Sequence, residues 1–122
     1  VYCFSTSLQV TAILLLLTKF SFADNTSLYN EANELYKKAE YPAAIEKYEL
    51  VLKSNFVSGE LYYNLGNAYC SLNDFGRGLS RLERSLVIFR GFFGPAHPLT
   101  QLVERNVTAL RVLMSQSDGL RK

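Results

Sequence analysis

The chain repeats a pattern of small and apolar residues at an interval of 34 positions. Ala32 lies 34 residues before Gly66, and Ala44 lies 34 residues before Gly78, so small side chains recur at two fixed points. Large apolar side chains recur at the same interval, as Tyr41 and Phe75, Ile45 and Leu79, and Leu52 and Leu86. A period of about 20–50 residues is typical of proteins that stack one supersecondary unit on the next. This repeat constrains the fold more than any other feature of the sequence.

Each repeat unit has the spacing of two amphipathic helices joined by a short turn. Apolar residues recur at helical intervals over 28–39 and 42–54 in the first unit, and over 59–72 and 75–90 in the second. Pro42 is compatible with the first turn of its helix, where a missing N–H is no loss. Asp74 is a candidate N-cap for the last of these helices. The pattern predicts an all-α fold.

The stretch LYYNLGNAYCSLNDFGRGLSRLERSL resembles the tetratricopeptide repeat, which has a 34-residue period. The resemblance implies a short α-solenoid over residues 24–116, with repeats at about 26–57 and 59–97. Its repeat-packing positions fall on Ala32, Tyr41, Ala44, Tyr48, Tyr62, Leu65, Gly66, Tyr69, Phe75, Gly78 and Leu82. Two features depart from the family pattern: Glu31 replaces a leucine, and neither copy ends in the usual proline.

Gly66 lies inside a predicted helix, where glycine costs roughly 1 kcal/mol relative to alanine. The resemblance implies that Gly66 and Gly78 lie where the two helices of a repeat cross. Small side chains at such a crossing let the backbones approach closely. We therefore expect Gly66 to be a packing residue and not a flexible break.

A less regular third unit follows. The stretch GPAHPLTQLVERN resembles the turn of longer, kinesin-light-chain-like versions of the repeat. It predicts a turn over 91–97, a third first-type helix over 98–116 as the terminal helix, and a flexible tail over 117–122. His97 is the only histidine of the chain, and we expect it to be a structural or capping residue.

The N-terminus has a different composition from the rest of the chain. The run VTAILLLL is followed by small residues at Ser21 and Ala23, as in a secretory signal peptide that is cleaved after Ala23. The predicted location is then periplasmic or secreted. Residues 1–9 carry no Lys or Arg, so an uncleaved N-terminal anchor over 1–23 stays open as the alternative, and only then would the protein contact a membrane.

Catalytic and ligand motifs are missing from the sequence. It contains no nucleophile elbow, phosphate loop or HExxH motif, and no Cys/His cluster for a metal. The net charge of +2 argues against a dedicated nucleic-acid binder. We therefore expect neither an enzyme nor a cofactor or metal. The acidic pairs Glu31/Glu34 and Glu46/Glu49 lie near lysines and are predicted to be solvated ion-pair residues.

The resemblance implies a concave groove lined by the first helix of each unit, which binds a protein or peptide partner. By analogy, the groove positions are Tyr29, Asn30, Asn33, Tyr36, Lys37, Tyr63, Asn64, Asn67, Cys70, Ser71 and Arg105, with Ala109 continuing the wall. Family members that bind chaperone tails hold a carboxylate with two asparagines and several basic residues. Tyr29, Leu102 and Asn106 occupy the basic positions here, so this clamp is not expected. The arginines at 77, 81 and 84 are expected to face outward.

The stretch GELYYNLGNAY after an apolar N-terminus is similar to the small exported tetratricopeptide proteins of bacterial aerotolerance operons. The sequence thus favours an exported, non-catalytic scaffold for protein–protein or peptide binding, and it leaves a homodimer open. The alternative is a membrane-anchored structural subunit of an aerotolerance-type envelope complex.

Overall fold

The computed structural model describes residues 24–121, and every element in that range is helical. An N-terminal helix covers residues 24–37 and is followed by α2 (Tyr41–Lys53), α3 (Gly59–Ser71), α4 (Phe75–Phe93) and α5 (Pro98–Leu120). The all-helical class expected from the sequence is confirmed for these residues. The expected signal peptide or anchor over 1–23 lies outside the described residues.

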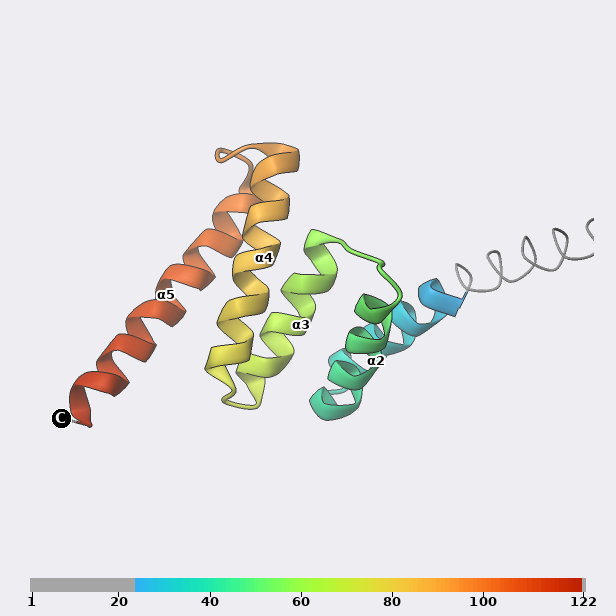
Figure 1. Ribbon diagram of the computed structural model, residues 1–122, viewed down its shortest axis with the longest axis horizontal. Coiled ribbons are helices and arrows are strands. Elements are labelled where there is room, and N and C mark those ends of the chain that lie inside the picture. The colour runs from blue at the N-terminus through green and yellow to red at the C-terminus, as the bar shows by residue number, and fades with distance from the viewer. Residues whose placement is uncertain (1–23, 122) are drawn as a thin grey trace, which may run out of the picture.

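The helices form a row in which each packs on the next along the chain (Figure 1). The N-terminal helix and α2 stand at one end, and α5 stands at the other, against α4. Contacts join α2 to α3, α3 to α4 and α4 to α5. Adjacent helices thus pack as they do in helical-repeat proteins, with each element in contact mainly with its sequence neighbours.

The 34-residue period is visible in the backbone. Ala39 and Asn73, which are 34 positions apart, both adopt the left-handed conformation, with φ of 60°. The next amide in each case closes the preceding helix in the same way: the N–H of Glu40 donates to the carbonyl of Leu35, and the N–H of Asp74 donates to that of Tyr69. These are the bonds of a Schellman motif, which ends a helix by satisfying its last carbonyls. Both units therefore turn with the same geometry between their helices.

Local capping follows the sequence. The Asp74 carboxylate accepts a hydrogen bond from the N–H of Arg77, and Pro42 lies in the first turn of α2, as predicted. Ser58 caps α3 by accepting from the N–H of Leu61 at 3.0 Å. His97 caps α5, because its Nδ1 accepts from the N–H of Leu99 at 3.2 Å. The expected capping role of His97 is confirmed.

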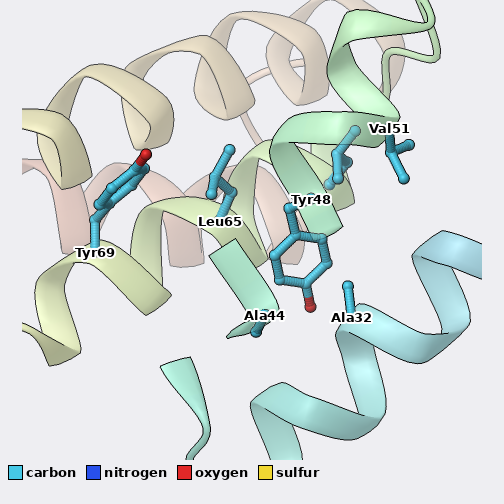
Figure 2. Close-up of a cluster of buried hydrophobic side chains, with 7 residues drawn as sticks. Ala32, Ala44, Tyr48, Val51, Leu65 and Tyr69 are labelled. Atoms are coloured by element: carbon cyan, nitrogen blue, oxygen red, sulfur yellow. The ribbon is translucent and has the colours of Figure 1, made fainter. Parts of the chain in front are cut away.

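The core consists of two clusters of buried side chains that share α3. The first cluster joins the N-terminal helix, α2 and α3, and its buried members include Ala32, Ala44, Tyr48, Val51, Leu65 and Tyr69 (Figure 2). The second cluster joins α4 to α5 through Leu82, Val103, Val107 and Leu110, with Tyr63 and Cys70 of α3 packed against it.

Gly66 and Gly78 meet where α3 crosses α4. A Cβ added at Gly66 would lie 2.8 Å from Cγ of Leu82 and 3.1 Å from the carbonyl oxygen of Gly78. A Cβ at Gly78 would collide with Sγ of Cys70 and lie 3.1 Å from the carbonyl oxygen of Gly66. Each glycine therefore makes room for the backbone of the other, as expected for a packing glycine.

The turn predicted over 91–97 is shorter in the structure. Helix α4 continues to Phe93, and Gly94, with φ of 82°, is the residue that ends it. The ring of Phe93 lies 6.0 Å from that of Phe89 and stacks at 4.3 Å on His97. We attribute the extra helical turn to these ring contacts, which outweigh the low helix propensity of Gly91.

The ends of two other helices also differ from the prediction. Residues 117–120 continue α5 and do not form the expected tail, since α5 ends at Leu120. The first helix already includes residue 24 and ends at 37, because Ala39 takes the left-handed conformation that stops it. The left-handed turn at Ala39, rather than the apolar period, thus sets the end of the first helix.

Candidate binding groove

Side-chain hydrogen bonds connect the first helices of the successive units. The Asn64 amide donates to Oδ1 of Asn33 at 3.2 Å, which links α3 to the N-terminal helix. The Tyr48 hydroxyl donates to the same oxygen at 2.7 Å. On the other side, the Asn106 amide of α5 donates to the Tyr63 hydroxyl at 3.3 Å. The N-terminal helix, α3 and α5 thus share one polar layer, although they are separated along the chain by α2 and α4.

The predicted groove residues divide into two groups in the structure. Tyr29, Asn33, Tyr36, Tyr63, Asn64, Asn67 and Cys70 are half-buried, whereas Asn30, Lys37, Ser71 and Arg105 are exposed. A hydrogen bond joins Asn33 to Asn64. A second one joins Tyr63 to Asn106 of α5. Lys37 instead pairs with Glu34 at 2.7 Å on its own helix, and the Ser71 hydroxyl donates to the carbonyl of Asn67 at 3.0 Å.

Tyr29 packs into the first core cluster, with ring centroids 6.0 Å from Tyr48 and 6.2 Å from Phe56. Its hydroxyl is buried and has no hydrogen bond among the described residues. Burial, with a smaller contribution from the nearby Glu60 carboxylate, raises the pKa of Tyr29 to about 12. Burial also raises the pKa of Tyr48 and of Tyr36. These hydroxyls are therefore neutral at physiological pH.

Two pockets lie between α3 and α5, with α4 as their floor. The larger pocket has a volume of about 480 Å³ and the smaller one about 270 Å³. The larger pocket is lined by Glu60, Tyr63, Asn64, Phe89, Phe93, Leu99, Leu102 and Val103. The smaller pocket is lined by Asn67, Cys70, Leu82, Asn106, Ala109, Leu110 and Leu113. We call the two pockets together the candidate groove.

Four of the residues predicted from the sequence to form a groove line these pockets: Tyr63 and Asn64 the larger, and Asn67 and Cys70 the smaller. Ala109 lines the smaller pocket from α5. The aromatic floor at Phe89 and Phe93 was not predicted. Two phenylalanines four positions apart near the end of a helix were the available signal, but the predicted turn at 91 placed Phe93 outside the helix.

Arg81 does not face outward as expected. Its guanidinium pairs with the Glu49 carboxylate at 2.9 Å, and both side chains are largely covered, at 31% and 27% exposure. The Tyr69 hydroxyl donates to the same carboxylate at 3.0 Å. Glu49 therefore links α2 to α3 and α4.

Two other acidic residues form the lysine pairs expected of them. Glu31 pairs with Lys47 at 3.2 Å, and Glu34 pairs with Lys37 at 2.7 Å.

Arg77 and Arg84 remain at the surface, and each lies over a tyrosine ring. The guanidinium carbon of Arg77 is 4.7 Å from the centroid of Tyr69, and that of Arg84 is 6.0 Å from the centroid of Tyr62. Neither arginine lines the candidate groove.

No protein-family model matches the chain, and no curated protein is significantly similar to it in sequence. Within residues 24–121, no group of three or more His, Cys, Asp or Glu side chains is placed to hold a metal ion. The helices of that range also lack the combination of length and apolar character that a membrane span requires.

Proposed function

We propose that this protein is a non-catalytic scaffold of the tetratricopeptide-repeat type that binds a peptide or protein segment in the candidate groove. The observation that carries the proposal is the pair of largely apolar pockets between α3 and α5, bordered by Tyr63 and three asparagines. Apolar clefts with a few polar groups at the rim are typical binding sites. Asparagine can donate and accept hydrogen bonds at once, as an extended peptide backbone requires.

The repeat assignment rests on two further supports. The 34-residue period in the sequence recurs in the backbone at Ala39 and Asn73. The glycine crossing of α3 and α4 matches the small residues that the tetratricopeptide pattern has at these positions.

Variants on the two surfaces of the protein test the groove. We expect Tyr63→Ala to weaken binding of a captured partner by about 2 kcal/mol, because aromatic anchors in interfaces typically contribute this much. Arg84→Ala, outside the groove, is the matched control and should leave affinity within about twofold. Isothermal titration calorimetry with the purified partner measures both. Loss of binding in Arg84→Ala with none in Tyr63→Ala would place the site near Arg84, outside the candidate groove.

We further propose that the protein acts outside the cytoplasm after cleavage behind Ala23, as the N-terminal sequence pattern indicates. Intact-mass spectrometry of the protein from its native host should give a mature N-terminus at Asp24. Retention of residues 1–23 in the membrane fraction would favour the alternative, an anchored structural subunit of an envelope complex.

A further inference from the structure

We infer that the larger pocket binds a phenylalanine-like side chain of an extended peptide. The same peptide carries a Lys or Arg two positions before or after that aromatic residue. This inference rests on the proposed function and adds the chemistry of the partner to it. Three features of the pocket lead to it: its aromatic and aliphatic lining, its single carboxylate, and the spacing between the two.

The lining is apolar, and part of it faces solvent. Phe93 is 48% exposed and Leu99 is 43% exposed, although both line the pocket. The stack on His97 at 4.3 Å and the contact with Phe89 at 6.0 Å hold the Phe93 ring in place. The pocket is therefore already formed, and an apolar side chain that enters it removes existing apolar surface from water. The volume of about 480 Å³ accommodates an aromatic ring.

Glu60 supplies the charge selectivity. Among the described residues that line the larger pocket, Glu60 alone carries a formal charge. Within residues 24–121 its carboxylate belongs to none of the ion pairs. It lies in the first turn of α3, where the helix dipole stabilises an anion, and its charge raises the pKa of the neighbouring Tyr29. A cation on the bound segment would give this exposed carboxylate an ion-pair partner, which residues 24–121 do not provide.

The spacing favours residues two apart in the peptide. Glu60 lies next to the aromatic lining, because a Cβ added at the preceding residue, Gly59, would be 2.7 Å from Cε1 of Phe89. In an extended peptide, side chains on one face are those at positions i and i+2, about 7 Å apart. A peptide whose aromatic residue enters the pocket can therefore place a basic residue at position i+2 or i−2 over Glu60.

The test is a nuclear magnetic resonance titration of the ¹⁵N-labelled full chain with short capped peptides. The probes are acetyl-GFGKG-amide and acetyl-GKGFG-amide, and the comparison peptides replace Phe by Ala or Lys by Glu. We expect at least one probe to shift the amide signals of Phe93, Leu99 and Val103. Each comparison peptide should bind about tenfold more weakly, because the aromatic anchor is lost in the first and the charge opposite Glu60 is reversed in the second.

A pair of glutamate variants separates the charge effect from folding. Glu60→Gln should abolish the preference for Lys over Glu in the peptide while it keeps the preference for Phe over Ala. Glu46→Gln, an exposed glutamate on α2, is the matched control and should change neither preference. A Glu60→Gln protein that still prefers Lys would overturn the role of Glu60.

The remaining outcomes distinguish this inference from the proposed function. Peptides that shift α3 and α5 signals without preferring Phe and Lys would overturn the inference alone. If no peptide shifts the amide signals of α3 and α5, the result would count against both the inference and the proposed function. Pocket signals of the peptide-free protein that change on dilution would assign the pocket to a second copy of the chain, and the peptide inference would be wrong.

Discussion

Gly66 and Gly78 show at the scale of single residues why a helix can contain glycine. Each lies in a helix, where alanine would be favoured by roughly 1 kcal/mol. At Gly66, however, a Cβ would come within 2.8 Å of Leu82 and 3.1 Å of the Gly78 carbonyl oxygen. The backbone atom cannot move without separating α3 from α4. Close packing thus decides the residue type against local propensity.

We therefore expect Gly66→Ala to lower the free energy of unfolding by roughly 1–3 kcal/mol, as overpacked core sites do. Gly91→Ala is the matched control, because Gly91 is also helical but has no neighbouring atom within 4 Å of an added Cβ. That substitution should raise the free energy of unfolding by about 0.5–1 kcal/mol. Urea denaturation followed by circular dichroism measures both. Equal stability of wild type and Gly66→Ala would show that the crossing has room for a methyl group.

At the scale of elements, the turn between the helices of a repeat depends on one left-handed residue. In the second unit this residue is Asn73, which tolerates a positive φ better than most residues do. In the first unit it is Ala39, for which the left-handed conformation is strained by roughly 1–2 kcal/mol. The hydrogen bond from Glu40 to Leu35, at 2.9 Å, shows that the motif forms nonetheless.

Replacing Ala39 by glycine removes this strain. We expect Ala39→Gly to raise the free energy of unfolding by about 0.5–1 kcal/mol, since glycine is the preferred residue at this position of a Schellman motif. Ala43→Gly, two residues into α2, should instead lower it by roughly 1 kcal/mol. Thermal melts of the two variants check the opposite signs. If Ala39→Gly is less stable than wild type, the extra conformational entropy of glycine in the unfolded chain outweighs the strain that the substitution removes from the folded state.

At the scale of the whole molecule, the two core clusters are not independent because both use α3. Leu61 and Leu65 of α3 belong to the first cluster, while Tyr63 and Cys70 pack against the second. Loss of the first cluster therefore removes support from the second. Two tyrosines in or against the first cluster, Tyr29 and Tyr48, have pKa values raised by burial.

Alkaline pH should unfold the protein through these tyrosines. Tyr29 ionises at about pH 12 in the folded state and near pH 10 when unfolded. The folded state thus binds more protons between these values, and stability falls as pH rises from 10 toward 12, whereas below pH 10 it is unaffected by this group. We expect one cooperative loss of helical circular dichroism in that range, together with the rise of tyrosinate absorbance.

Tyr29→Phe tests this mechanism. It keeps the ring and removes a hydroxyl that has no hydrogen bond among the described residues. The variant should melt within a few degrees of wild type at pH 7 and unfold at a higher pH than wild type. An unchanged alkaline midpoint would mean that the buried Tyr29 hydroxyl does not drive the transition.

Features that depend on neighbouring residues could be predicted from the sequence. The helical periodicity, the proline in the first turn of α2, the Asp74 cap and the His97 cap involve residues within a few positions of one another. The resemblance of the 34-residue repeat to the tetratricopeptide pattern also implied that Gly66 is a packing residue, because that pattern has small side chains where the two helices of a repeat cross. The all-helical class follows from these signals alone.

Contacts between residues distant along the chain were decided only by the tertiary structure. The extra turn of α4 depends on Phe93 stacking on His97, and the covered position of Arg81 depends on Glu49, 32 residues earlier. The larger pocket exists because α3, α4 and α5 each contribute to its wall, with Glu60 and Phe93 brought together from opposite ends of the second unit. Helical spacing determines which face of a helix is apolar. The way in which the helices cross determines which apolar residues stay exposed and which charged residues form ion pairs.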